Sequence, residues 1–279
     1  MKKKLWLIIL LFITLSILAI AADAYYLSMK RLDINYTKLS SLQIPKSHDN
    51  LSIALISDIE YGTFLQRETL EKFQKKLENI QPDILLFAGD MFDTNITPTE
   101  SDQIVLTNFL SSIDAKYGKF AVLGEMDEAN KEVVEKILYD SNFEMIENQA
   151  MRIRKDTQDY IYLVGLPIVT STSIDTTTLF ADIPEEAYVI TLCHTPDIFT
   201  LLPTTQVDVL FSGHSHGYQI NIPFYGSYET LIGNENHTLG LNHMDGVRVY
   251  VTKGIGTTKQ NIRLFCDPEI PIFRLQANN

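Results

Sequence analysis

Two histidines, His214 and His216, follow an apolar run in the stretch VDVLFSGHSHG, which spans residues 207–217. The run is short, rich in Val, Leu and Phe, and closed by glycine, which is typical of a buried strand. An extended chain would place both rings on one face, while Gly213 and Gly217 allow the backbone to turn. Neutral imidazole is a common metal ligand, so the stretch predicts a strand that ends in two ligands of a metal site.

The same residues also fit the G-x-S-x-G pattern of serine hydrolases, in which Ser215 would be the nucleophile. That pattern requires a helix after the strand, and then an acid and a histidine later in the chain. Pro223 stands where the helix would run, and the only acids between Ser215 and His243 are Glu229 and Glu235. The context therefore favours a metal site over a serine nucleophile.

Further polar residues lie directly after short apolar runs at 51–57, 83–88, 119–123 and 187–193. A single acid in such a position usually caps a helix or a turn, but five strands that end in the same way are hard to attribute to capping. A mixed carboxylate and imidazole set of this size suggests a binuclear site, which can clamp an in-line displacement and supply hydroxide near neutral pH. The set comprises Asp58, Glu60, Asp90, Asp93, Glu125, Asp127, His194, His214 and His216.

The elements that must position these residues alternate between strand and helix up to about residue 142. Apolar periodicity predicts helices at about 67–79, 101–112 and 130–139. Such units indicate an α/β architecture with a partly parallel sheet, because the carboxyl ends of its strands gather ligands at one edge.

Beyond residue 142 the pattern changes to strands joined by polar turns. A short helix is expected after residue 197, and the last part of the chain is expected to supply antiparallel edge strands. The predicted strands of this half, besides the two that carry the histidines, lie at 143–146, 150–154, 160–166, 247–251, 262–265 and 272–275.

The N-terminus predicts a membrane-inserting segment. Three lysines at positions 2–4 precede eighteen residues, Leu5 to Ala22, whose only polar members are one Thr and one Ser. The length lies at the lower limit for spanning a bilayer, and the lysines should remain cytoplasmic. We expect residues 1–26 to form an uncleaved anchor in the cell membrane, with the rest of the chain on the extracytoplasmic side. Small residues near Ala21 keep open the alternative of a cleaved signal peptide and a secreted protein.

After the anchor we expect a connector at 27–50 and one domain at 51–279, because 45% apolar residues in a chain of 279 suffice for one large core. The formal charge is −12, and 20 basic against 35 acidic residues remain without the N-terminal lysines. This balance gives no electrostatic basis for binding nucleic acid. Cys193 and Cys266 lie in apolar contexts and are expected to be buried free thiols.

In the order of its motifs the chain resembles the calcineurin-like metallophosphoesterases, and more closely their membrane-anchored bacterial branch, over about residues 51–275. That family carries D-x-H, G-D-x-x-D, G-N-H-D/E, a lone H and G-H-x-H. The corresponding residues here are D-I-E at 58–60, G-D-M-F-D at 89–93, G-E-M-D at 124–127, His194 and G-H-S-H at 213–216. The resemblance implies a four-layer α-β-β-α sandwich, two sheets face to face with helices outside.

The resemblance also implies a ligand set and a reaction. Asp58 and His216 would hold the first metal ion, Asp90 would bridge, and His194 and His214 would hold the second. The implied activity is hydrolysis of a phosphoester by a metal-bound hydroxide. A lipid or other envelope phosphoester is suggested as substrate by the location alone.

Three residues differ from the family pattern. Glu60 replaces a metal-binding His, Glu125 replaces a metal-binding Asn, and Met126 replaces the His that would protonate the leaving group. Both glutamates can still bind metal, and their charge favours Mn²⁺ or Mg²⁺ over Zn²⁺ or Fe. The expected ligands of the two divalent ions are Asp58, Glu60, Asp90, Glu125, His194, His214 and His216.

A thioether such as that of Met126 cannot donate a proton, and a positioned general acid contributes about 10²- to 10⁴-fold. Two interpretations stay open. One is an enzyme for substrates with acidic leaving groups, such as aryl phosphates or pyrophosphates, with Asp90, Asp127 and His243 as catalytic candidates. The other is a non-catalytic binding module that keeps the fold.

Overall fold

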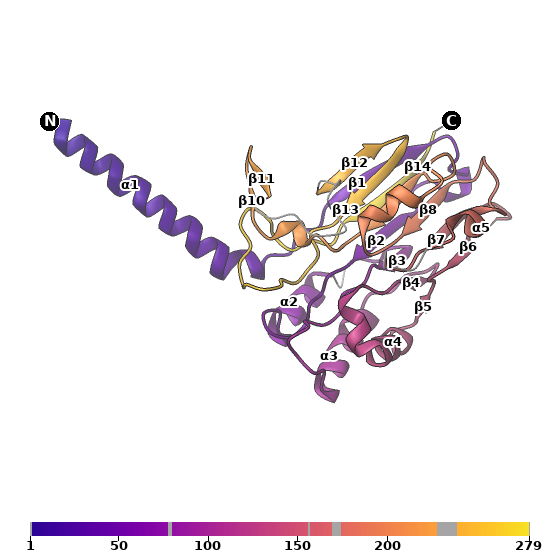
Figure 1. Ribbon diagram of the computed structural model, residues 1–279, viewed down its shortest axis with the longest axis horizontal. Coiled ribbons are helices and arrows are strands. Elements are labelled where there is room, and N and C mark those ends of the chain that lie inside the picture. Colours follow the sequence, from indigo (N-terminus) through magenta and orange to yellow (C-terminus); the bar gives the residue numbers. More distant parts are fainter. Residues whose placement is uncertain (1, 78–79, 156, 169–173, 228–238, 279) are drawn as a thin grey trace.

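The computed structural model describes residues 2–77, 80–155, 157–168, 174–227 and 239–278 (Figure 1). Its body is built on two six-stranded sheets. The first sheet has the order β1-β14-β2-β3-β4-β5 and is parallel from β2 to β5. Its strands are β1 (Tyr36–Ser41), β14 (Ile272–Ala277), β2 (Ser52–Ile56), β3 (Ile84–Phe87), β4 (Lys119–Ala121) and β5 (Phe143–Met145).

The second sheet has the order β12-β13-β9-β8-β7-β6 and is parallel from β13 to β7. Its strands are β12 (Gly240–Met244), β13 (Val247–Val251), β9 (Val209–Ser212), β8 (Val189–Leu192), β7 (Tyr160–Gly165) and β6 (Gln149–Arg154). A separate two-stranded hairpin consists of β10 (Asn221–Ile222) and β11 (Gly226–Ser227).

The two sheets pack face to face through buried aliphatic and aromatic side chains. Leu55 of the first sheet and Phe211 of the second belong to this layer, and the rings of Phe211 and Phe273 lie 4.3 Å apart. Side chains alternate along each strand, so every second residue of both sheets enters the shared core. Burial of each such Phe or Leu contributes about 1.5–3 kcal/mol.

Helices cover the outer face of each sheet. On the first sheet, α2 (Arg67–Leu77), α3 (Glu100–Ser111) and α4 (Lys131–Asp140) bury one apolar stripe each. The start of α3 is fixed by a capping box between Thr99 and Asp102. The second sheet is covered by α5 (Thr176–Phe180) and the 3-10 helix Pro196–Leu201. The expected four-layer α-β-β-α sandwich is therefore confirmed.

Three details differ from the sequence-based expectations. Residues 36–41, within the expected connector, form strand β1 because their backbone pairs with β14. Strands β13 and β14 are not antiparallel edges, because β13 lies between β12 and β9 and runs parallel to β9, and β14 lies between β1 and β2 and runs parallel to β1. Residues 262–265 form no strand, since Arg263 is fully buried and donates hydrogen bonds to the carbonyl groups of Lys253 and Gly256.

The first helix, α1 (Lys2–Ala22), projects away from the body and buries none of its side chains (Figure 1). Together with the helical turns that follow it to Lys30, it is long and apolar enough to cross a membrane, a property that signal sequences share. Its base is attached to the body. The backbone N–H of Arg263 donates to the carbonyl of Ala24 at 3.1 Å, and Arg31 pairs with Asp267 at 2.5 Å.

Candidate metal centre

The predicted site residues follow the carboxyl ends of five parallel strands, β2, β3, β4, β8 and β9. Because the two sheets face each other, these strand ends lie at one rim of the sandwich, where loops rather than further strands fill the space. All nine polar residues of the set are buried except Glu125, whose side chain is 35% exposed. The topology thus brings together residues from 58 to 216 in the sequence.

The backbone at this rim is left-handed at non-glycine residues. The φ angle is +51° at Asp58, +61° at Asp90, +67° at His214 and +48° at His216. For a residue with a Cβ this conformation costs about 1–2 kcal/mol, and such outliers cluster at functional sites. The chain does not stay extended after β9, so His214 and His216 do not simply share the face of a strand.

Gly213 is required because neighbouring atoms approach its Cα closely, and not because of a left-handed backbone. A Cβ at this position would collide with the hydroxyl of Ser57 and the carboxylate of Asp58. The N–H of His214 donates to the two carboxylate oxygens of Asp58 at 2.9 and 3.1 Å. The glycine therefore lets the histidine loop sit directly on the first aspartate.

Seven carboxylate and imidazole side chains form three overlapping groups that are each suited to a metal ion. Within each group the ligand atoms lie within 4.8 Å of one another. Asp90 and His194 each belong to two of the groups, which joins them into one centre. The groups are Glu125, His194 and His214; Asp58, Asp90 and His194; and Glu60, Asp90 and His216.

Hydrogen bonds orient the imidazoles of this centre. Nδ1 of His194 lies 2.6 Å from the carbonyl oxygen of Ala88, so it carries the proton and leaves Nε2 to face Oδ2 of Asp90 at 3.0 Å. Nδ1 of His214 lies 2.7 Å from Oε1 of Glu125. Nε2 of His216 lies 3.5 Å from Asp58 and 3.6 Å from Glu60.

Several polar atoms of the centre have no hydrogen-bond partner among the described residues, although they are buried. They include Oε1 of Glu60, Oδ2 of Asp90 and Nε2 of His194. Buried polar atoms are normally satisfied, and buried carboxylates are costly without a compensating charge. The donor set therefore fits divalent cations, which would satisfy these atoms.

The charge distribution supports the same interpretation. Burial raises the pKa of Asp58 to about 6, and burial together with Asp90 raises the pKa of Glu60 well above its ordinary value. Burial acts to lower the pKa of His194, but the carboxylate of Asp90 raises it well above its ordinary value, so a cation bound at this ring would replace a proton. Burial, with Arg263, lowers the pKa of His216, which keeps that ring neutral as a metal ligand must be.

A cavity of about 440 Å³ opens beside the centre. Met126 lines it, so the position at which the family carries a general acid does face the space where a substrate would lie. Lys259 also lines the cavity, and sequence reasoning missed it. The only signal near it is a glycine-rich stretch that ends three residues earlier, at Gly256. The lining consists of Asp90, Asp93, Thr94, Asn95, Glu125, Met126, His214, His216, Thr258 and Lys259.

Asp127 supports the centre from behind and does not line the cavity. Its carboxylate accepts the backbone N–H groups of Asp90 and Met91, each at 2.8 Å, and of Gly124 at 2.9 Å. All three hydrogen bonds hold the loops that carry Asp90 and Glu125. In the structure the Asp127 carboxylate thus contacts backbone amides and not the cavity, whereas the sequence suggested proton transfer. Burial raises its pKa to about 7.

His243 lies away from the centre. It belongs to β12, where it pairs with Arg248, and Arg248 in turn pairs with Val209 at the start of β9. The candidate ligands His214 and His216 follow the other end of β9, and the His243 side chain is exposed. The pairing of β12 with β13 therefore places His243 at the end of the sheet that is opposite these residues.

Ser215 does not have the setting of a serine nucleophile. Its side chain is fully buried, and its hydroxyl donates to the carbonyl of Thr252 at 3.1 Å. A three-residue 3-10 turn, His216–Tyr218, follows in place of the required helix. The acids considered for this alternative, Glu229 and Glu235, lie outside the described residues.

Arg263 is a second residue that sequence reasoning missed. Its guanidinium holds the loop at 253–256 by hydrogen bonds to backbone carbonyl groups. In that loop, a Cβ on Gly254 would press on Asp58 and one on Gly256 would collide with the carbonyl of Ile59. The buried arginine therefore fixes the wall against which the first metal ligands pack.

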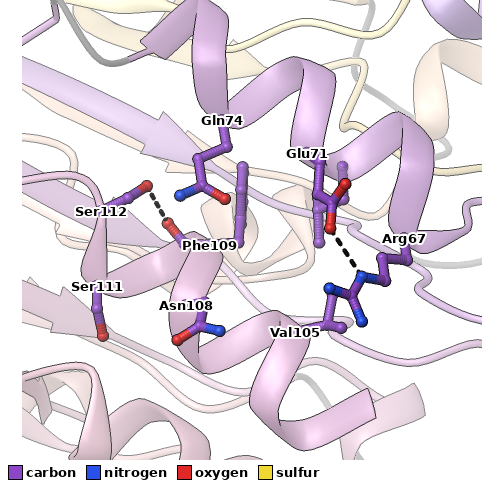
Figure 2. A pocket seen from close by; sticks show the side chains of 9 residues that line it. Arg67, Glu71, Gln74, Val105, Asn108, Phe109, Ser111 and Ser112 are labelled. Atoms are coloured by element: carbon purple, nitrogen blue, oxygen red, sulfur yellow. Dashed lines mark hydrogen bonds and ion pairs between the residues drawn. The ribbon is translucent and has the colours of Figure 1, made fainter. Parts of the chain in front are cut away.

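A second hollow, of about 410 Å³, lies between α2 and α3 (Figure 2). Its polar lining includes the ion pair between Arg67 and Glu71, at 2.7 Å, together with amide and hydroxyl groups. Among the residues that line it, none belongs to the three ligand groups. Within the part of the chain that the structure describes, the three groups of candidate metal ligands all lie at the strand ends.

Comparison with known proteins agrees with this geometry. A family model described as calcineurin-like phosphoesterase matches residues 51–218. The chain is 24% identical to the uncharacterized metallophosphoesterase YkuE of Bacillus subtilis, over 92% of this chain and 90% of that protein. It is 29% identical to the UDP-2,3-diacylglucosamine pyrophosphatase LpxG of Chlamydia muridarum, over 94% and 96%. It is 21% identical to the phosphodiesterase YaeI of Escherichia coli, over 80% and 81%.

Proposed function

The chain belongs to the calcineurin-like phosphoesterase family, and we propose that it is a membrane-anchored hydrolase of phosphoesters that uses two divalent cations. The observation that carries this proposal is the sharing of Asp90 and His194 between ligand groups beside an open cavity. Sharing of this kind suits two ions close together, which stabilise both the attacking and the leaving oxygen of a displacement at phosphorus. Asp58, Glu60 and His216 would serve one side of the centre, and Glu125 and His214 the other.

Manganese or magnesium suits this centre better than zinc or iron. Four carboxylates, from Asp58, Glu60, Asp90 and Glu125, accompany three imidazoles. Carboxylate oxygens are hard ligands and favour Mg²⁺ and Mn²⁺, whereas zinc sites are richer in nitrogen and sulfur. The additional negative charge also reduces the attraction of the loaded centre for an anionic phosphate, which makes a positive side chain in the cavity valuable.

Lys259 supplies that charge. It lines the cavity together with three acidic residues, Asp90, Asp93 and Glu125. An ammonium group in this position would bind a phosphoryl oxygen and stabilise the charge that develops on it. We assign Lys259 to substrate binding.

The leaving group is proposed to be acidic. The Met126 side chain lines the cavity and cannot protonate an alkoxide, while Asp127 and His243 do not line it. A pyrophosphate linkage leaves as a stabilised phosphate anion and requires little protonation. The pyrophosphatase name of LpxG supports the same choice, and we infer a pyrophosphate or aryl phosphoester attached to a lipid or another envelope component.

The location follows from α1. Lys2, Lys3 and Lys4 precede its apolar stretch, so we propose that they remain in the cytoplasm and that the body lies on the outer side of the cell membrane. This arrangement places the cavity next to envelope lipids.

The test is metal analysis of full-length protein purified without chelator, followed by assays on an activated aryl phosphodiester with Mn²⁺. We expect about two tightly bound divalent ions and turnover that Asp90→Ala abolishes. Protein without bound transition metal and without Mn²⁺-dependent cleavage would refute the proposal.

The placement of Met126 in the cavity also favours a second candidate, a binding module that retains the fold without catalysis. The triple variant Glu60→His, Glu125→Asn, Met126→His separates the two. Turnover by the natural chain supports the enzyme, whereas turnover only by the triple variant supports the module.

A further inference from the structure

The β10–β11 hairpin displays apolar side chains to solvent. Phe224 is fully exposed at its tip, Tyr225 is 79% exposed and Ile222 is 39% exposed. Phe265, which is 57% exposed, lies next to Leu264, whose backbone pairs with β10. We call these four residues the aromatic edge. Large apolar groups gathered on one exposed segment mark an interaction surface.

The hairpin carries no charge. Its sequence from residue 221 to 227, NIPFYGS, contains no Asp, Glu, Lys, Arg or His in a chain whose formal charge is −12. A surface that recognises a folded protein usually combines such aromatics with a polar, charged rim. Uncharged aromatic residues at a protruding tip instead match the composition that proteins place at the membrane–water boundary.

The aromatic edge is attached to the base of α1. The N–H of Arg263 donates to Ala24, and Asp267 accepts hydrogen bonds from Ser28 and Arg31. Phe265 therefore lies between two residues that fix the helix base. In Figure 1 the hairpin rises from the end of the body at which α1 departs. A membrane around α1 would lie within reach of the hairpin tip.

The aromatic edge is also attached to the cavity. The hairpin begins directly after the turn that carries His216, and the N–H of Gln219 donates to the carbonyl of His216 at 3.1 Å. The side chain of Gln219 accepts the N–H of Thr258 at 2.6 Å, and Thr258 lines the cavity. Leu264 donates to the carbonyl of Gln219 at 2.8 Å. One hydrogen-bonded unit thus connects the helix base, the hairpin and the rim of the cavity.

We propose that the aromatic edge inserts into the outer surface of the bilayer that α1 spans and holds the cavity rim against it. The occupant of this surface is lipid. The substrate is therefore a phosphoester in the headgroup region of a membrane amphiphile, bound without leaving the bilayer. This inference rests on the proposed function for the anchoring by α1 and for the hydrolysis at the metal centre. Because α1 keeps the edge near the surface, even a weak insertion is effective.

Insertion is tested with full-length protein in vesicles of phosphatidylcholine and phosphatidylglycerol. Trp6 is the single tryptophan of the chain, so a Trp6→Phe background isolates one introduced reporter. Tyr225→Trp is compared with the matched control Tyr139→Trp, because both tyrosines are 79% exposed and Tyr139 lies on α4. We expect bromine-labelled lipid to quench the reporter at 225 and aqueous iodide to quench the reporter at 139.

Equal quenching of both reporters by iodide, with none by labelled lipid, would overturn the proposal. Protection of the reporter at 225 from iodide that depends on protein concentration and not on lipid would identify a second copy of the chain as the occupant. That result would also overturn the proposal. The quenching result does not require catalysis, so it stands whether or not the chain hydrolyses phosphoesters.

The substrate class is tested with the double variant Phe224→Ser, Tyr225→Ser. We expect its rate on a pyrophosphate-linked amphiphile in vesicles to fall by at least about tenfold, because productive encounters depend on the effective concentration at the surface. Its rate on a soluble aryl phosphodiester should stay within about twofold, as the centre is untouched. Equal rates of the variant and the natural chain on the amphiphile would contradict the inference, and absence of turnover by the natural chain on both substrates would instead contradict the proposed function.

Discussion

Oδ1 of Asp90 accepts the backbone N–H of Met126 at 2.9 Å, while Oδ2 of the same carboxylate faces Nε2 of His194 at 3.0 Å. One oxygen is therefore committed to the loop after β4, and the other is directed at the metal ligands. This division fixes the orientation of the residue that two ligand groups share.

Asp90→Asn should lower the number of bound divalent ions from two to one or fewer and reduce kcat by at least about 100-fold, because the bridging charge is lost. Asp93→Asn is the matched control, since Asp93 lines the same cavity but belongs to none of the three ligand groups. Metal content by mass spectrometry and turnover of an aryl phosphodiester measure the effect. Full metal content in Asp90→Asn would show that both divalent ions bind without the Asp90 carboxylate.

Metal affinity should fall as the pH is lowered from about 7 to 5. Burial raises the pKa of Asp58 to about 6, so this carboxyl group gains a proton within that range and the proton competes with the cation. Binding of Mn²⁺ should accordingly release protons. Calorimetry in buffers of different ionisation enthalpy measures this release, and an affinity that is constant across the range would exclude Asp58 as a ligand.

Lys259→Ala should raise KM for an anionic phosphoester by about tenfold, since the loss of a charged contact to phosphate costs about 1.5 kcal/mol or more. Lys259→Arg should retain most of the affinity because it retains the charge. Lys75→Ala on the exposed side of α2 is the control for net charge. If both alanine variants change KM equally, the effect is long-range and Lys259 does not bind substrate.

Met126→His should accelerate the cleavage of alkyl phosphoesters by about 10²-fold and leave aryl phosphoesters nearly unchanged, because only a poor leaving group needs a general acid. The ratio of the two rates is the informative measurement, as it cancels any change in metal content. An equal gain on both substrates would indicate that the histidine binds metal or substrate and does not donate a proton.

Asp127→Ala should destabilise the protein by about 2–4 kcal/mol, because three backbone N–H groups lose their acceptor in a buried setting. Denaturant unfolding of the variant gives the change. At saturating Mn²⁺ the residual activity should keep the natural pH profile, since Asp127 positions the loops without exchanging protons with substrate. If the pH–activity profile of the variant loses its acidic or its basic decline, Asp127 has the proton-transfer role instead.

Much of the fold was readable because buried faces impose a period on the sequence. Leu70, Phe73 and Leu77 mark one face of α2, and the described helix begins at Arg67, as expected, and continues to the last described residue before the gap, Leu77. The short apolar runs of β2, β3, β8 and β9 were equally clear, since strands that are buried on both faces contain few polar residues. Their position before the acids and histidines is what made the metal centre predictable.

The edge strands were harder to recognise. The sequence of β1, YTKLSS, buries only Leu39, and β12 has no buried residue, so neither carries a strong apolar pattern. Their structure comes from pairing with β14 and β13, which were predicted as strands although their neighbours in the sheets were not predicted.

The direction of a side chain is not encoded in a motif. Asp90 and Asp127 both follow strands, yet one faces the metal ligands and the other faces backbone amides. That difference arises from left-handed backbone at Asp90 and from close packing at Gly124, where a Cβ would collide with Oδ1 of Asp90. Lys259 and Arg263 were missed because their contacts come from loops that only tertiary packing brings to the rim.

The backbone and the side chain of Met126 have different contacts, since its N–H donates a hydrogen bond to Asp90 and its side chain lines the cavity. The amide of residue 126 maintains the architecture of the centre, and every amino acid except proline supplies that amide. The side chain of the same residue lines the cavity. A single substitution at residue 126 can therefore change the chemical group that faces the cavity while the hydrogen bond that orients Asp90 is kept.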